Sequence, residues 1–194
     1  MSATTLSLLD QTELLQLATG ASAGGDSGAA IGYLKEAVSR PDAIGAAHYL
    51  LGAEYAQIGL YERASGAMEA AIALDPALSV ARLQLGLLWL SGGAPDKADL
   101  ALAPLDDLSV DDPMRLFGRG LRHLIKDEFD DATACLQAGI AANTANAPLN
   151  GDMQRIVEQI ARVRAGGALP DAAPPVAAEA HQMLLSAYTS NTDS

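Results

Sequence analysis

The feature that most constrains the fold is a pattern that returns three times at an interval of 34 residues. Each copy has a glycine in an apolar stretch, a ring-bearing side chain three positions later, and an alanine twelve positions after the glycine. The copies are Gly52, Tyr55 and Ala64; Gly86, Trp89 and Ala98; and Gly120, His123 and Ala132. A fixed period of this length is typical of units that bury their apolar faces against neighbouring copies. The chain is therefore expected to form an array of similar units, an organisation that favours a binding function.

Each unit is predicted to be a helical hairpin. Apolar residues recur at helical spacing on both sides of Gly59. Gly59 suits the left-handed conformation that commonly ends a helix, and a second helix is expected to begin at Tyr61. Small residues at Gly52 and Ala64 would let the two helix backbones approach closely. Pro76 cannot continue the second helix comfortably and therefore marks the end of the unit.

These residues resemble the tetratricopeptide repeat. The best copy spans residues 45–78, and it matches the family pattern at Leu51, Gly52, Tyr55, Gly59, Tyr61, Ala64, Met68, Ala71, Asp75 and Pro76. Further copies are assigned to residues 79–112, where Pro104 should stop the second helix early, and to residues 113–146. A weaker copy spans residues 11–44, and its leading helix is expected to be shortened by Gly20, Gly24, Gly25 and Gly28. The resemblance implies an all-α fold, a superhelix of such hairpins (an α-solenoid).

The remaining segments are assigned around this array. Residues 150–164 have apolar positions at three-to-four-residue spacing, which predicts an amphipathic helix that caps the last repeat. The repeat domain is therefore expected to span residues 1–165. Residues 166–175 are rich in Gly, Ala and Pro and are predicted to be a linker. A short C-terminal helix is expected over residues 176–188, followed by a frayed tail over residues 189–194.

Composition excludes several classes of function. The formal net charge of −12 and the absence of clustered Lys and Arg disfavour binding to nucleic acid. No apolar run approaches the roughly 18 residues that a membrane span requires. The first residues lack a basic segment followed by an apolar core, and Cys135 is the single cysteine, which is compatible with a reducing compartment. A cytoplasmic protein without membrane contact is therefore expected.

Motifs for catalysis or cofactor binding fail on specific grounds. Residues 20–27 have the glycine spacing of a phosphate-binding loop, but Asp26 stands in place of its essential lysine. The three histidines lack the spacing of zinc ligands, and packing positions are predicted for His48, His123 and Cys135. The acidic runs at 106–112 and 127–131 are interpreted as solvated turns between helices, the second one near a helix N-terminus. No catalytic residue, cofactor site or metal ligand is predicted, and the chain is not expected to be an enzyme.

The resemblance implies that the first helix of each hairpin lines a concave groove. Family members that clamp the C-terminal carboxylate of heat-shock chaperones carry Lys, Arg and Asn there, whereas the positions in this chain are almost all apolar. An apolar groove predicts binding of an extended or helical apolar segment of a protein or peptide. The predicted groove residues are Tyr49, Ala53, Val80, Leu83, Leu87, Leu90, Met114, Phe117, Leu121 and Leu124.

Two functions follow from such a groove. The first is a non-catalytic adaptor or assembly chaperone, for which the chain resembles the small tetratricopeptide-repeat chaperones of type III secretion. The second is a structural or regulatory subunit whose groove is filled by the chain itself, through its own C-terminal helix (residues 176–188) or tighter closure of the array, and which self-associates. A large apolar stripe left uncovered is unusual in a soluble protein, and this keeps the second function as the alternative to the adaptor, which is the leading prediction.

Overall fold

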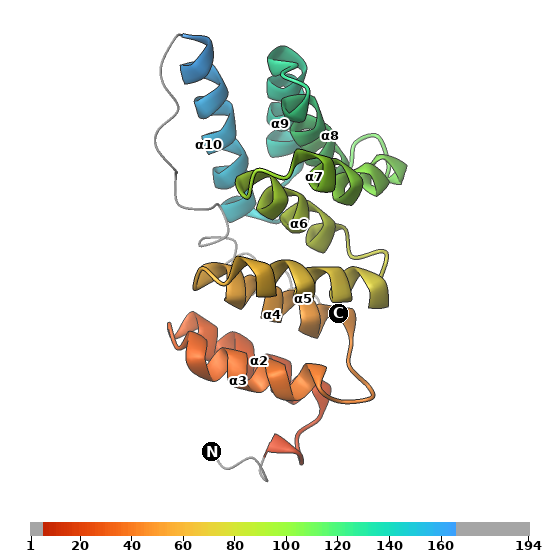
Figure 1. The fold of residues 1–194 in the computed structure, drawn as a ribbon, viewed down its shortest axis with the longest axis vertical. Coiled ribbons are helices and arrows are strands. Elements are labelled where there is room, and N and C mark those ends of the chain that lie inside the picture. Colours follow the sequence, from red (N-terminus) through yellow and green to blue (C-terminus); the bar gives the residue numbers. More distant parts are fainter. Residues whose placement is uncertain (1–5, 166–194) are drawn as a thin grey trace. The chain divides into compact units, whose positions relative to one another are not determined.

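The computed structural model describes residues 6–165; the expected linker, C-terminal helix and tail (residues 166–175, 176–188 and 189–194) lie outside the described residues. All regular structure in residues 6–165 is helical (Figure 1). The helices are α2 (Gln11–Ala23), α3 (Ser27–Val38), α4 (Gly45–Gln57), α5 (Tyr61–Leu74), α6 (Ser79–Ser91), α7 (Pro95–Leu102), the 3-10 helix η1 (Ala103–Asp107), α8 (Pro113–Ile125), α9 (Phe129–Ala142) and α10 (Ala147–Arg164). The chain divides into two compact units, and the boundary lies within α6, between Ala81 and Arg82.

Unit 1 contains two helical hairpins. Helix α2 packs against α3, α4 packs against α5, and α3 also contacts α4. The buried faces are built mostly from small and branched apolar residues, as Ala-rich helix packing requires. The fully buried members are Leu14, Leu15, Ala30, Ala37, Ala47, Ala64 and Ala71. The weaker repeat copy therefore forms a complete hairpin.

The expected shortening of the first helix by Gly20 is wrong. Helix α2 continues through Gly20 to Ala23, and space around the Gly20 Cα is open. A capping box stabilises the start of this helix: the Asp10 carboxylate accepts from the Glu13 backbone N–H, and the Glu13 carboxylate accepts from the Asp10 N–H, both at 2.8 Å. A single glycine costs a helix about 1 kcal/mol relative to alanine, which capping of this kind offsets.

One turn geometry recurs at the 34-residue interval in both units. The residues with positive φ in the described chain are Gly25 (78°), Gly59 (78°), Gly93 (71°) and Asp127 (59°). Each follows the first helix of a hairpin, which confirms the left-handed conformation expected for Gly59. Only three of the four are glycine, and Asp127 adopts the same conformation at the cost that a side chain adds there.

Two backbone hydrogen bonds close each of these turns. The N–H of the left-handed residue donates to the carbonyl three residues earlier, from Gly25 to Ser22 and from Asp127 to Leu124, for example. The next N–H donates to the carbonyl five residues earlier. These longer bonds join Asp26 to Ala21 (2.9 Å), Leu60 to Tyr55 (2.8 Å), Ala94 to Trp89 (2.8 Å) and Glu128 to His123 (3.0 Å). The pair of bonds is the Schellman motif, which satisfies the last carbonyls of a helix.

The repeated glycine marks a close approach of the two helices in a hairpin. A Cβ added to Gly52 would lie 2.9 Å from Met68 Cγ and 3.1 Å from the Ala64 carbonyl oxygen. At the next two repeats a Cβ on Gly86 would meet Leu102, and one on Gly120 would meet Leu136 and the Ala132 carbonyl oxygen. Each glycine therefore makes room for a large side chain of the second helix, as expected from the sequence.

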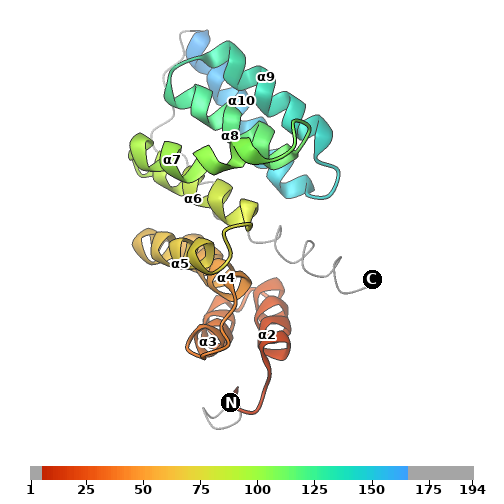
Figure 2. The same ribbon diagram turned by 90° about the vertical axis from the view of Figure 1, so that its right-hand side faces the viewer.

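Unit 2 is built around one buried cluster of apolar side chains. Figure 2 shows α8, α9 and α10 of this unit side by side. Helix α8 packs against α9, α7 and η1, and α10 packs against α9. Helix α7 ends at Leu102, two residues before Pro104, and η1 follows it. This agrees with the early stop expected from that proline. The cluster includes Leu149, Met153, Ile156, Val157 and Ile160 of α10, so this helix caps the last hairpin.

The close contact at Gly52 predicts opposite effects for two glycine-to-alanine changes in unit 1. Gly52→Ala forces Met68 and the α5 backbone to move and should lower the free energy of unfolding by about 1–3 kcal/mol. Gly66→Ala is the matched control, because nothing lies within 4 Å of its added Cβ on α5. It should raise the free energy of unfolding by about 1 kcal/mol through helix propensity. Urea unfolding measures both; equal effects would contradict the close approach.

The turn at Asp127 predicts that glycine is the better residue there. Asp127→Gly should raise the free energy of unfolding by about 1 kcal/mol, because it removes the cost of a side chain at positive φ. The reverse change at the equivalent turn, Gly93→Asp, should lower it by a similar amount. Thermal unfolding of the two variants is the measurement, and a destabilised Asp127→Gly protein would show that the aspartate side chain supports the turn.

Candidate functional site

The predicted groove residues are all at least partly buried. Six are buried: Tyr49, Ala53, Leu83, Leu87, Phe117 and Leu121. Four are partly buried: Val80, Leu90, Met114 and Leu124. Not one of the ten is exposed, so the chain itself already removes much of this apolar surface from water.

In unit 2 the buried members belong to the core. Leu83, Leu87, Phe117 and Leu121 lie in one cluster with apolar side chains of α9 and α10. The Phe117 ring packs so closely on α9 that a Cβ added to Gly139 would lie 2.5 Å from two of its carbons. Leu90, Met114 and Leu124 pack against the edge of this cluster and keep some exposure. These three are the accessible part of the predicted groove in unit 2.

In unit 1 the notable predicted residue is Tyr49. Its side chain is 3% exposed, and its hydroxyl has no hydrogen-bond partner among residues 6–165. Burial raises the pKa of Tyr49, so the phenol stays neutral at physiological pH. A buried hydroxyl without a hydrogen-bond partner costs free energy, so the Tyr49 hydroxyl does not stabilise the fold. The contribution of Tyr49 to stability therefore comes from the packing of its ring.

Asp26, His48 and Cys135 lie at the start of α3, in α4 and in α9. Asp26, which stands where a phosphate loop has lysine, accepts a hydrogen bond from the Ala29 N–H at 2.9 Å and caps α3. Burial lowers the pKa of the half-buried His48. Burial, above all, raises the pKa of the Cys135 thiol, against the opposing charge of Arg119. A raised pKa reduces the thiolate fraction, so Cys135 is a poor nucleophile.

The two acidic runs are used for pairing and capping. Asp106 pairs with Arg122, whose Nε also donates to Asp99 at 2.7 Å, so that Arg122 ties α8 to η1 and α7. The hydrogen bond that Arg122 donates to Asp99 is the main cause that raises the pKa of Arg122. Asp112 caps α8 by accepting from the Met114 N–H at 2.7 Å. In the second run, Asp130 lies in the first turn of α9 and pairs with Arg164 of α10.

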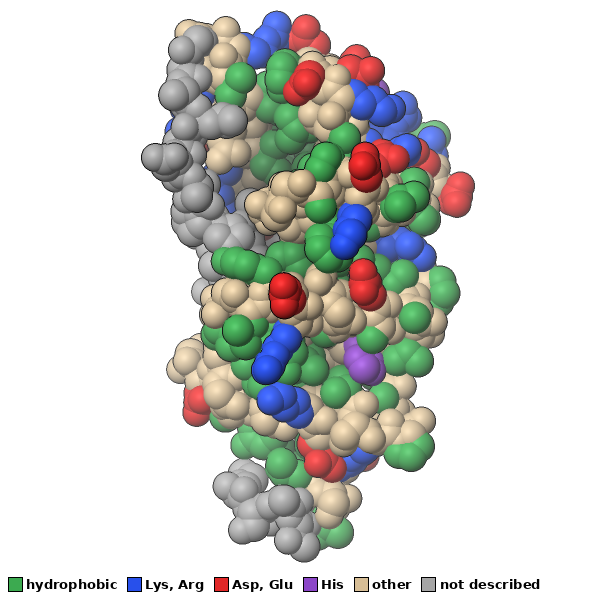
Figure 3. Space-filling view, viewed as in Figure 1, with side chains coloured by type: hydrophobic (Ala, Val, Ile, Leu, Met, Phe, Trp, Pro, Cys, Tyr) green, Lys and Arg blue, Asp and Glu red, His purple; other side chains and the backbone are tan. Residues whose placement is uncertain are grey.

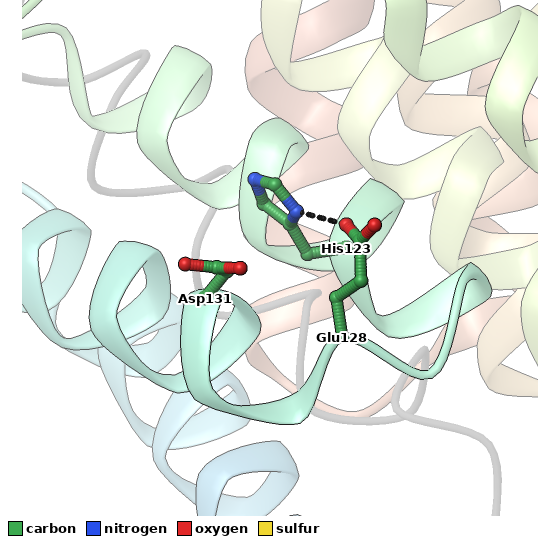
Figure 4. A group of neighbouring side chains, drawn as sticks. All are labelled: His123, Glu128 and Asp131. Atoms are coloured by element: carbon green, nitrogen blue, oxygen red, sulfur yellow. Dashed lines mark hydrogen bonds and ion pairs between the residues drawn. The ribbon is translucent and has the colours of Figure 1, made fainter.

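One polar group in unit 2 brings together three side chains that could hold a metal ion. His123 lies in the last turn of α8, Glu128 in the turn, and Asp131 in the first turn of α9 (Figure 4). One ligand atom from each lies within 4.8 Å of the others, and His123 Nδ1 is 2.6 Å from Glu128 Oε2. Sequence reasoning assigned His123 to packing and the acids to a solvated turn. The sequence signal for this group is the ring-bearing position of the repeat, His123, followed by acidic residues five and eight positions later.

Charged side chains of both signs lie on the face of the described chain that Figure 3 draws. On the face drawn in Figure 3, acidic and basic side chains are interspersed among apolar ones, without a broad basic patch. No helix in residues 6–165 combines the length and apolar character of a membrane span.

Comparison with known proteins identifies the type of fold. No protein-family model matches the sequence, and no curated protein does. A crystal structure of MamA is 26% identical over 69% of this chain and 78% of that chain, with a TM-score of 0.57. MamA 41-end from Desulfovibrio magneticus RS-1 is 17% identical over 95% of this chain and 97% of that one, with a TM-score of 0.59. The MamA RS-1 ArsTM double mutant is 17% identical over 94% and 96%, also with a TM-score of 0.59.

These likenesses and the hairpins described above establish the fold class expected from the sequence. The chain has an all-α helical-repeat fold of the α-solenoid class with a capping helix.

The buried phenol of Tyr49 predicts that loss of its hydroxyl does not destabilise the protein. Tyr49→Phe should leave the free energy of unfolding unchanged or raise it by up to about 1 kcal/mol, since it removes a hydroxyl that is desolvated without a partner. Tyr61→Phe, at an exposed ring of α5, is the control and should have no effect. Chemical unfolding compares the two. A loss above 1 kcal/mol for Tyr49→Phe would mean that the hydroxyl finds a partner in solution.

Proposed function

We propose that this chain is a non-catalytic protein-interaction scaffold that acts as an adaptor or assembly chaperone. The observation that carries the proposal is the set of large apolar side chains in unit 2, Leu90, Met114 and Leu124, that stay partly exposed beside a well-packed core. The helical-repeat fold supports it, because stacked hairpins present extended surfaces suited to binding. The 26% identity with MamA supports a related scaffold at the level of the fold.

The chemistry of these residues points to an apolar segment of a protein or peptide. Leucine and methionine side chains offer burial without hydrogen-bonding groups, so affinity would come mainly from apolar area removed from water. Methionine adapts its shape to different partners, which suits a surface that accepts an extended or a helical segment. The proposal includes a cytoplasmic location. It does not include binding to nucleic acid or to a membrane.

A second function, a structural or regulatory subunit that self-associates, is favoured by a different observation. The buried groove positions of unit 2 pack against α9 and α10 of the same chain, which leaves less apolar area for a foreign partner. Filling of the groove by residues 176–188 belongs to this alternative and stays a prediction.

The partly exposed positions allow a test that keeps the fold. We expect the double variant Leu90→Glu and Leu124→Glu to reduce partner capture at least tenfold, because charge at these edge positions would have to be desolvated on binding. Leu121→Glu is unsuitable, since Leu121 is 0% exposed and a buried carboxylate there would unfold unit 2. Leu100→Glu is the matched control, because Leu100 is 74% exposed and lies outside the predicted groove.

The measurement combines affinity capture from the native source with the molar mass of the purified chain in solution. A stoichiometric foreign chain that the double variant loses and the control keeps supports the adaptor. A homo-oligomer that the double variant dissociates supports the self-associating subunit. Identical behaviour of wild type, double variant and control would refute both.

A further inference from the structure

The repeats differ in what surrounds the ring near the end of the first helix. The copies are numbered here from the weaker one over residues 11–44, so that the second spans residues 45–78. In the second copy the Arg63 guanidinium lies over the Tyr55 ring, 5.9 Å from its centroid. In the third copy the Lys97 ammonium lies over the Trp89 ring at 4.3 Å. Both pairs are eight residues apart, and both are cation–π contacts. In the last copy the ring is the imidazole of His123, and the residue eight positions later is Asp131, a carboxylate.

The residue that follows the left-handed position of the turn also becomes acidic in the last copy. In the three Schellman turns whose accepting residue carries a ring, the residue five positions after the ring donates its N–H back to the ring residue's carbonyl. That residue is Leu60 in the second copy and Ala94 in the third, which is the apolar choice usual for this motif. In the last copy it is Glu128, whose carboxylate lies 2.6 Å from His123 Nδ1. A ring–cation contact is thus replaced by an imidazole with two carboxylates (Figure 4).

The two carboxylates have little positive charge to balance them. Within the described chain neither Glu128 nor Asp131 forms an ion pair with Lys or Arg. The adjacent Asp130, in contrast, pairs with Arg164. His123 is the group that faces both carboxylates, and a neutral imidazole brings no charge.

We propose that His123, Glu128 and Asp131 bind a divalent first-row transition-metal ion, of which Zn²⁺ is the test case. One imidazole nitrogen and two carboxylate oxygens are a donor set that these ions accept. Ligand atoms around tetrahedral zinc lie about 3.4 Å apart. On binding, the 2.6 Å contact between His123 and Glu128 would therefore open, and the wider separations in the group, which lie within 4.8 Å, would close.

The exposure of the site suits an exchangeable ion. The side chain of His123 is partly buried, whereas Glu128 and Asp131 are exposed, so the ion can enter from solvent and keep water at its remaining positions. Because the ligands lie on both sides of the turn, a bound ion would tie the last turn of α8 to the first turn of α9. The proposal concerns this turn alone and is independent of partner binding.

The test uses the full chain without an affinity tag, titrated with ZnCl₂ in a buffer free of chelators and followed by calorimetry. Wild type should bind one ion per chain at this site. His123→Ala, Glu128→Gln and Asp131→Asn should each weaken binding at least tenfold. The sharpest variant is Asp131→Lys, which restores the cation found at the equivalent position of the third copy and should abolish binding while the hairpin stays folded. Circular dichroism checks the fold.

Controls remove other donors one at a time. His48→Ala, His181→Ala, Cys135→Ser and Asp130→Asn should leave the affinity unchanged within twofold. Zinc should also raise the melting temperature of wild type and of these controls but not of Asp131→Lys, since only an ion bound to the folded turn stabilises it. Wild-type affinity in Asp131→Lys, loss of binding in Cys135→Ser or His181→Ala, or the absence of zinc binding to wild type would overturn the proposal.

Discussion

A residue that can hold a positive φ is the constraint on which each hairpin depends. The first helix must end and the chain must turn back within three residues, while the last helical carbonyls still need donors. The left-handed residue meets both needs, because it directs its own N–H and the next one back to the helix. Where the second helix begins, which residues face the first helix, and where the close glycine contact falls all follow from that turn.

Close packing between the two helices of each hairpin is the main feature of both units. A glycine of the first helix admits Met68, Leu102 or Leu136 of the second, so the hairpins are held by close contact and small residues more than by aromatic stacking. Polar interactions act at the ends of helices, as with the Asp10 capping box and the Arg122 pairs. Binding on this framework would use side chains that the packing leaves partly or fully exposed.

Local sequence signals predicted the hairpins well. Gly59, Pro104 and the close-contact glycines act through backbone sterics, which depend on a few neighbours in sequence. The extent of α2 was mispredicted because Gly20 was weighed alone, although Asp10 and Glu13 carry the capping signal three residues apart. How far the predicted groove is buried could not be derived this way, since the burial of Phe117 and Leu121 depends on α9 and α10. The group at His123 required comparison of equivalent positions across the repeats.

The recurrence of the left-handed turn at 34 residues also sets how the chain can change in length. Insertion or deletion of a whole repeat keeps every turn in register with the glycine it serves. A change of one or two residues inside a hairpin would instead rotate Met68 or Leu136 away from the glycine that makes room for it. Evolution of such a chain would therefore proceed in blocks, with smaller length changes confined to the connections between hairpins.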